Sequence, residues 1–172
     1  MIGYLLRYNV RRKLKRLQYD FTQFTVESFV RCIEAVRGRS IVFVPTAFPA
    51  GYYGAWITAK DEPVEYVCYN ENLPQLHQAH VKLHELAHII CGHETLALNN
   101  REMKKLLDNG GDLSAILCRS NELKSAQSER EAEMMAAMIQ AMVHGQAGQP
   151  ELASSSPAGK SYLSIFCDRE QE

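Results

Sequence analysis

The chain lacks several features that define large protein classes. It has no run of about 18 consecutive apolar residues, so no membrane-spanning helix is expected. Its five cysteines are odd in number and widely spaced, with no Cys-x-x-Cys pair, which predicts reduced thiols rather than a disulfide framework. Its formal net charge is only −1, which excludes a generally basic coat for nucleic acid. It also lacks the order of charged, apolar and small residues found in signal peptides, so the cytoplasm is the expected compartment.

What remains is the composition of a folded domain with a basic N-terminal segment. Of the 172 residues, 46% are hydrophobic and 23% are charged, which is enough for a substantial core. Residues 1–16 contain six basic side chains and no acidic one, leaving 13 basic against 20 acidic residues in the rest of the chain. Apolar residues recur at helical spacing, so residues 1–20 are expected to form a basic amphipathic helix. Its apolar stripe could pack on the domain, or the helix could contact nucleic acid or a membrane surface.

Residues 21–144 alternate between helical and strand-like patterns. Helices are predicted over residues 25–37, 75–91 and 127–144, with Thr25 as an N-cap and with Gly38 and Gly92 as helix ends. Strands are predicted over residues 40–45, 52–59 and 64–69, and their connections are too short for helical crossovers. The expected fold class is therefore α+β, with a small three-stranded antiparallel sheet packed against helices. Residues 145–172 begin with a stretch rich in Gly, Pro, Ser and Ala and are expected to be a flexible linker and tail.

The decisive motif is His84-Glu85-Leu86-Ala87-His88, an H-E-x-x-H sequence within a predicted helix. Residues four apart lie on one face of a helix, so the imidazoles of His84 and His88 can converge on one metal ion. Glu85 stands beside the first histidine, where it can hold the metal-bound water, and zinc peptidases use this spacing for that reason. The alternative is three polar residues on a solvated face. The apolar residues around the motif favour the metal, because uncompensated burial of such polar groups is costly.

A third protein ligand must come from elsewhere in the chain. Glu129 lies 41 residues after His88, at the start of the last predicted helix, and it shares a helix face with Glu133. One of these two carboxylates can bind the metal while the other holds a histidine from behind. Glu131, between them, points away. The alternative is an acidic first turn that interacts favourably with the helix dipole.

Three stretches together resemble one known family. They are His84–His88, Gly92-His93, and Glu129-Arg130-Glu131-Ala132-Glu133 followed by Met-Met-Ala-Ala. They are similar to the ImmA/IrrE family of zinc metallopeptidases, whose pattern is H-E-x-G-H, a nearby L-H or G-H, and E-x-E-A-[ND]-x-F-A. The resemblance covers about residues 10–144 and implies that Glu129 is the third ligand. Glu133 replaces an Asp or Asn that supports a histidine, and its extra methylene leaves an exchange of the two roles open. Ala87 replaces the glycine of the pattern and Met135 its phenylalanine.

The resemblance implies a zincin-type pair of helices and a gluzincin-like metalloendopeptidase with one Zn²⁺ per chain. Zinc would lower the pKa of its water, and Glu85 would take the proton and deliver it to the leaving amine. A further donor must stabilise the oxyanion. Candidates for this role or for substrate contacts are Tyr52, Tyr53, Tyr66, Tyr69, His80 and His93. Residues 64–69 are the expected edge strand to which an extended substrate adds.

The resemblance also implies a biological role. Proteins of this kind cleave a helix-turn-helix repressor, which derepresses stress, mobile-element or anti-phage genes. Single-stranded DNA is a candidate activator that the basic segment would bind electrostatically. Short members described as toxin components share a basic start and a stretch like His77-Gln78-Ala79-His80. They keep open an alternative, a non-catalytic zinc-stabilised regulator or toxin–antitoxin component that binds a repressor without cleaving it. A cysteine thiolate, for instance that of Cys91, could also occupy the open zinc position.

Overall fold

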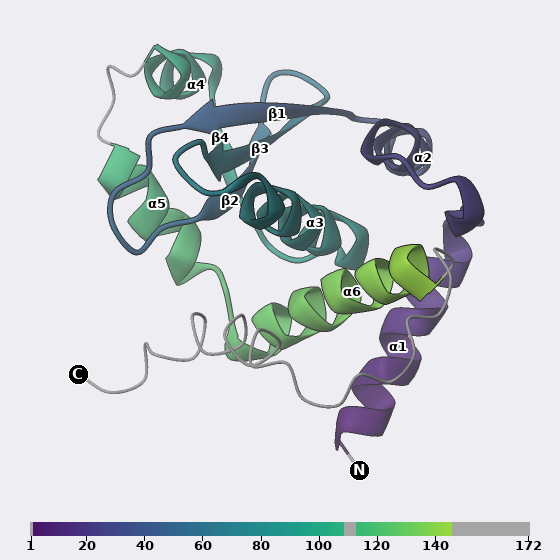
Figure 1. Cartoon of the computed structure of the whole chain (residues 1–172). Coiled ribbons are helices and arrows are strands. Elements are labelled where there is room, and N and C mark those ends of the chain that lie inside the picture. The colour runs from purple at the N-terminus through teal and green to yellow at the C-terminus, as the bar shows by residue number, and fades with distance from the viewer. Residues whose placement is uncertain (1, 109–112, 146–172) are drawn as a thin grey trace.

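The computed structural model describes residues 2–108 and 113–145, which form an α+β fold in layers (Figure 1). Helix α3 (Gln75–Cys91) lies against one face of a four-stranded sheet, and α6 (Ala126–Gly145) packs on α3 from below. Helices α4 (Asn100–Leu107) and α5 (Leu113–Glu122) cover the opposite face. The α+β class and the long helices are thus confirmed. Apart from Gly145, the linker and tail predicted for residues 145–172 lie outside the described residues.

The sheet differs from the predicted one in size and direction. Its strands are β1 (Ser40–Thr46), β2 (Gly54–Ala59), β3 (Val64–Asn70) and β4 (Leu96–Leu98), in the spatial order β1-β3-β2-β4. The β2–β3 hairpin is antiparallel as expected, but β1 pairs with β3 in parallel and β4 pairs with β2 in parallel. The prediction of three antiparallel strands was therefore wrong in the number of strands and in the direction of β1, and correct for the β2–β3 pair. The physical reason is that β2 connects β1 to β3. After β1 the chain forms β2 two strand positions away, and it then turns back so that β3 lies between β1 and β2, parallel to β1.

The position of β3 also corrects the expected place for substrate. Strand β3 is hydrogen-bonded to β1 on one side and to β2 on the other, so it offers no free edge for an added peptide.

The two faces of the sheet carry different cores. Trp56 and Val67 are cross-strand partners on the face that packs with α3 and α6. Ile57 and Tyr66 are partners on the face that packs with α4 and α5.

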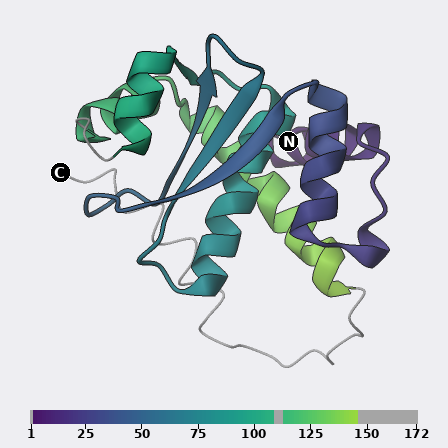
Figure 2. The ribbon, with the colours of Figure 1, turned by 90° about the horizontal axis from the view of Figure 1, so that it is seen from above.

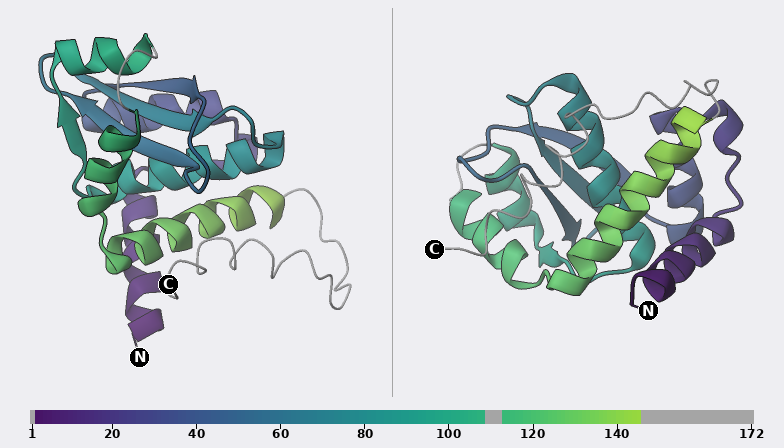
Figure 3. Two further views of the ribbon diagram at one scale, coloured as in Figure 1. Left: turned by 90° about the vertical axis from the view of Figure 1, so that its left-hand side faces the viewer. Right: turned by 60° about the horizontal axis from the view of Figure 1, so that its bottom comes forward.

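The basic N-terminal helix α1 (Ile2–Arg16) is anchored to the domain by its apolar stripe. Val10, Leu14 and Leu17 are all at most 8% exposed and belong to the core shared with α3 and α6. Packing on the domain was one of the two alternatives for this stripe, and it is confirmed. The first turns of α1 project beyond α6, and Tyr4 and Tyr8 there are exposed (Figure 3, left).

The next helices begin and end where local chemistry dictates. A short 3-10 helix, η1 (Phe21–Gln23), leads into α2 (Val26–Arg37), which lies beside β1 (Figure 2). Thr25 and Ser28 form a reciprocal capping box at its start, and Gly38 ends it with a φ of 66°. Both the N-cap and the terminating glycine were predicted.

Small residues let α3 and α6 approach closely. Ala87 on α3 and Ala132 and Ala136 on α6 are fully buried, and these two helices make the most extensive helix–helix contact among the described residues. The α3–α6 interface is therefore rigid enough to fix side chains from both helices relative to one another. Within residues 2–108 and 113–145, no helix is both long and apolar enough to cross a membrane.

Candidate metal centre

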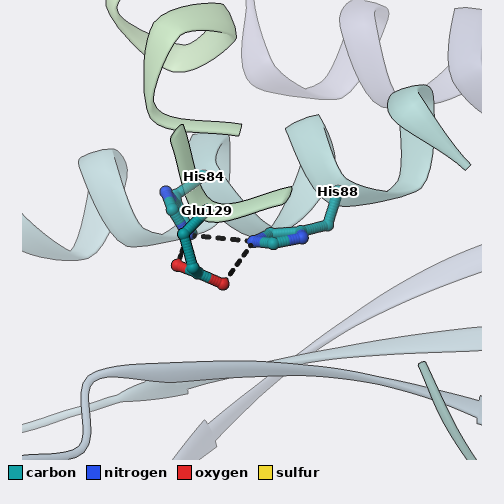
Figure 4. A group of neighbouring side chains, drawn as sticks. All are labelled: His84, His88 and Glu129. Atoms are coloured by element: carbon teal, nitrogen blue, oxygen red, sulfur yellow. Dashed lines mark hydrogen bonds and ion pairs between the residues drawn. The ribbon is translucent and has the colours of Figure 1, made fainter. Parts of the chain in front are cut away.

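The two histidines of the H-E-x-x-H motif point from α3 towards the start of α6. His84 is 5% exposed and His88 is 1% exposed, so the structure excludes a solvated helix face for them. Their Nε2 atoms lie 3.1 Å apart. Glu129 reaches both rings: Oε2 lies 3.2 Å from Nε2 of His84, and Oε1 lies 3.3 Å from Nε2 of His88 (Figure 4). The two Nε2 atoms and the carboxylate of Glu129, whose two oxygens each face one ring, thus form a cluster of donor atoms that we call the donor triangle.

Local sequence places Glu129 in this position. Ser125 and Ser128 form a reciprocal cap, in which each hydroxyl accepts a hydrogen bond from the backbone N–H of the other residue. Helix α6 begins at Ala126, directly after Ser125. Glu129 consequently lies in the first turn of α6, close to the positive end of the helix dipole. The predicted helix start near residue 127 is confirmed to within one residue.

The triangle has the dimensions of a tetrahedral metal site. A zinc ion with bonds of about 2.0–2.1 Å separates its ligand atoms by about 3.4 Å. Here the two Nε2 atoms are 3.1 Å apart, and they lie 3.2 and 3.3 Å from different oxygens of Glu129. One ligand atom from each of the three residues lies within 4.8 Å of the other two. Three protein ligands would leave one tetrahedral position open, as catalytic sites do. The residues present therefore fit a single divalent ion.

Glu133 supports His84 from the other side of the ring. Its Oε2 lies 3.4 Å from Nδ1 of His84 and 3.5 Å from Nε2 of His80. Glu133 thus contacts the nitrogen that points away from the donor triangle, whereas Glu129 contacts the nitrogen that points into it. This geometry favours Glu129 as ligand and Glu133 as support over the reverse.

The carboxylates dominate the electrostatics of His84. Burial alone lowers the pKa of its imidazole, but hydrogen bonds to Glu129 and Glu133 outweigh burial and raise that pKa to about 9. Burial raises the pKa of Glu133, but the contacts with His80 and His84 overcome it and lower that pKa to about 2. For His88, burial prevails and lowers the pKa of the imidazole.

A partly buried lysine completes the centre, and no sequence motif pointed to it. Lys124 lies between α5 and α6, and its Nζ is 3.4 Å from Oε1 of Glu85 and 3.7 Å from Oε1 of Glu129. Burial lowers the pKa of Lys124, but both carboxylates raise it and prevail, so the ammonium form is favoured. The other carboxylate oxygen of Glu85, Oε2, is buried and has no hydrogen-bond partner within the described part of the chain. That oxygen is therefore an unused hydrogen-bond acceptor.

Charge also favours a cation here. Glu85, Glu129 and Glu133 bring three carboxylates into contact with the two histidines and one ammonium, that of Lys124. With neutral histidines, these groups carry a surplus of two negative charges. Glu85 is buried, whereas Glu129 and Glu133 are partly exposed. A divalent ion between Glu129 and the two Nε2 atoms would neutralise this surplus.

Behind His88 lies a second group of polar side chains. Gly92 ends α3 with a φ of 71°, which folds His93 back against the helix. Nδ1 of His93 lies 2.9 Å from Nδ1 of His88, and Nε2 of His93 lies 3.2 Å from Oε2 of Glu131. His93 is thus on the far side of His88 from the donor triangle. Glu131 does point away from Glu129, as predicted, but it reaches this second group.

The remaining predicted contact residues fall in different places. Tyr66 is on the sheet face that packs with α4 and α5, so the sheet separates it from the donor triangle. Tyr69 holds the ammonium of Lys82 3.9 Å above its ring. His80 lies beside Glu133 and also contacts Gln140. Of these residues, the structure brings only His80 next to a residue of the centre, at its outer side.

The described cysteines do not enter the donor triangle. No disulfide joins Cys32, Cys68, Cys91 and Cys118, and Cys118 is exposed. Cys91, the residue considered as a zinc blocker, groups with His93 and Glu131 instead. Burial raises the pKa of its thiol to about 12. Among the described cysteines, none belongs to the group of possible metal ligands formed by His84, His88 and Glu129.

A cavity elsewhere marks a separate feature. It has a volume of about 590 Å³ and lies between α2, β1 and α3. Its walls include Glu34, Phe43 and Lys82, and none of its lining residues belongs to the donor triangle. The cavity is therefore not the place where the centre would meet a substrate.

Comparisons of the chain with protein-family models, with curated proteins and with solved structures gave no match in any of the three. The likeness to the ImmA/IrrE pattern consequently rests on the motif residues alone. What the centre can do has to be argued from its own geometry and charge.

Proposed function

We propose that the protein is a zinc-dependent endopeptidase of the ImmA/IrrE type. The observation that carries the proposal is the donor triangle of His84, His88 and Glu129, with nearest contacts of 3.1–3.3 Å. Glu85 is linked to it through Lys124, which contacts both Glu85 and Glu129. Imidazole and carboxylate donors in this number suit zinc. The support of His84 by Glu133 is also typical of protein metal sites, where an outer carboxylate fixes ring orientation.

The chain's own residues supply the remaining chemistry. A zinc ion held by the triangle would act as a Lewis acid, activating water and polarising a peptide carbonyl. Glu85, whose Oε2 is unpaired, would accept the proton of the attacking water and later donate it to the leaving amine. The ammonium of Lys124 would donate a hydrogen bond to the carbonyl oxygen as negative charge develops there. Lys124 thus takes the role for which tyrosines and histidines were the sequence-based candidates.

The substrate would lie along β2 rather than β3. Strand β4 pairs only with Ile57–Ala59, so Gly54 extends beyond β4 on that side of the sheet. A Cβ atom placed on Gly54 would lie 3.1 Å from Oε1 of Glu85, so this backbone passes directly beside the proposed base. An extended peptide following β2 would bring its scissile bond to Glu85.

By its resemblance to the family, the substrate would be a helix-turn-helix repressor in the cytoplasm. Its cleavage would derepress stress, mobile-element or anti-phage genes. Single-stranded DNA remains a candidate activator, and the projecting basic turns of α1, with exposed Tyr4 and Tyr8, are the surface that would bind it.

The test is a single substitution that spares the fold. Glu85→Gln keeps the size of the side chain and leaves the donor triangle intact. We expect it to retain one zinc per chain and to abolish cleavage of the candidate repressor, tested by co-incubation and mass spectrometry. A purified wild-type chain without stoichiometric zinc, prepared without chelators, would exclude the metalloenzyme.

One observation favours a second function, that of a non-catalytic zinc-stabilised regulator or toxin–antitoxin component. Oε1 of Glu85 is already paired with Nζ of Lys124, 3.4 Å away, so this carboxylate has a structural role that does not depend on catalysis. If Glu85→Gln preserves repressor binding and derepression in cells while the repressor stays intact, this second function is supported and the peptidase is excluded.

A further inference from the structure

A continuous chain of polar side chains links the basic helix α1 to the metal centre. Nζ of Lys13 lies 2.6 Å from Oε1 of Glu131, and Oε2 of Glu131 lies 3.2 Å from Nε2 of His93. Nδ1 of His93 lies 2.9 Å from Nδ1 of His88. Lys13, Glu131, His93 and His88 thus contact one another in that order, although they come from three separate segments of the chain. The last of them, His88, belongs to the donor triangle.

The hydrogen-bond directions of this chain are consistent with only one arrangement when a metal is bound. A metal on Nε2 of His88 leaves the proton on Nδ1, which must therefore donate to His93. Nδ1 of His93 then accepts, so its proton is on Nε2 and is donated to Glu131. Glu131 must be an ionised acceptor, and the ammonium of Lys13 stabilises that charge. Each member thus fixes the protonation of the next.

An ammonium, rather than a second metal, belongs in this group. Cys91, His93 and Glu131 offer three donor atoms within 4.8 Å of one another. Lys13, however, already supplies the positive charge: it contacts Glu131 and also donates to the backbone carbonyl of Cys91 at the end of α3, 3.2 Å away. Nδ1 of His93, moreover, faces His88. The group is therefore built to support His88.

We propose that Lys13, Glu131 and His93 form a positioning chain that holds the imidazole of His88 in its metal-binding tautomer and orientation. This inference rests on the metal centre of the proposed function, but not on peptidase activity. It makes α1 a part of the metal site in addition to any role in binding partners. Lys13 and Glu131 are positioning residues, since neither touches the donor triangle.

The test measures zinc affinity in the full-length chain, by competition with a chromophoric chelator. Glu131→Gln keeps the shape of the side chain but presents an amide where Lys13 needs a carboxylate. We expect it to weaken zinc binding about 10–100-fold, the usual effect of removing an outer partner of a ligating histidine, and Lys13→Met to weaken it about tenfold. The matched control is Lys15→Met on the exposed side of α1, which removes the same charge and should change affinity less than about twofold.

Two further measurements separate positioning from simple stabilisation. Cobalt absorption spectra of Glu131→Gln should shift relative to wild type, because the ligand field depends on the orientation of His88. The double variant Lys13→Met/Glu131→Gln should lose no more affinity than Glu131→Gln, because both changes break one chain. If the losses multiply, or if the variants unfold at lower temperature with unchanged zinc affinity and cobalt spectrum, the positioning chain is excluded while the zinc site stands. A wild type that binds no zinc would exclude the metal centre itself.

Discussion

In the protein without a bound metal, His84 is held between two carboxylates. Nε2 lies 3.2 Å from Glu129 and Nδ1 lies 3.4 Å from Glu133. Burial favours the neutral imidazole, yet these contacts raise its pKa to about 9 against an ordinary value of 6.5. We therefore predict that metal-free His84 is charged at neutral pH, and that Glu133→Gln lowers its pKa because one of the two carboxylates is removed.

The sign and size of the effect on stability follow from linkage. The pKa of His84 is higher in the folded than in the unfolded chain, so its contribution to stability is fully present below pH 6.5 and is lost as the pH rises through 9. The difference corresponds to about 3 kcal/mol. Zinc must displace this proton, so its apparent affinity should rise about tenfold per pH unit in this range.

The assay is an NMR titration of the histidine ring nitrogens in the metal-free chain, with thermal unfolding measured at the same pH values. Glu27→Gln, on the exposed side of α2, is the control for losing one carboxylate. If His84 titrates below pH 6.5, as burial alone would make it, or if Glu133→Gln and Glu27→Gln have the same effect, the assigned contacts are wrong.

Three further changes test other parts of the centre. Lys124→Met should lower turnover about 100-fold by removing an oxyanion donor, while zinc binds more tightly because a nearby positive charge is gone; unchanged turnover would exclude that role. Gly54→Ala places a methyl group 2.5 Å from Cγ1 of Val81 and 3.1 Å from Glu85, so peptide cleavage should fall at unchanged zinc content. Glu65 on β3 is fully buried, and its Oε1 lies 2.7 Å from the guanidinium of Arg37 at the end of α2. This ion pair stabilises the packing of α2 on the sheet. Glu65→Ala should cost about 3 kcal/mol in urea unfolding, and a loss below about 1 kcal/mol would contradict a structural role.

The helices and their ends could be predicted because their determinants are local. A helix of period 3.6 is visible in residues 75–91, and the structure places α3 at those same residues. Thr25 and Gly38 act through neighbours within four residues. The convergence of His84 and His88 follows from the i, i+4 spacing alone. The donor triangle needed only one non-local element, the docking of α6 on α3.

The sheet and the outer parts of the centre depend on non-local contacts that leave little trace in the sequence. A strand's pattern fixes its face but not its direction, so the parallel pairing of β1 with β3 had no signal. The three residues of β4 are too few for a pattern. Lys124 lies in a connection between helices, and Lys13 is one of six basic residues in its segment. Only the fold distinguishes these two lysines from solvated ones.

The spacing of glutamates on α6 ties these findings together. At about 100° per residue, Glu129 and Glu133 point within about 40° of each other, while Glu131 points to nearly the opposite side. The first pair meets the two sides of the His84 ring, and Glu131 meets His93, which Gly92 folds back behind His88. One helix thus provides outer support for both histidines. Two histidines on a solvated face would need no such support, so the arrangement itself argues for a cation between them.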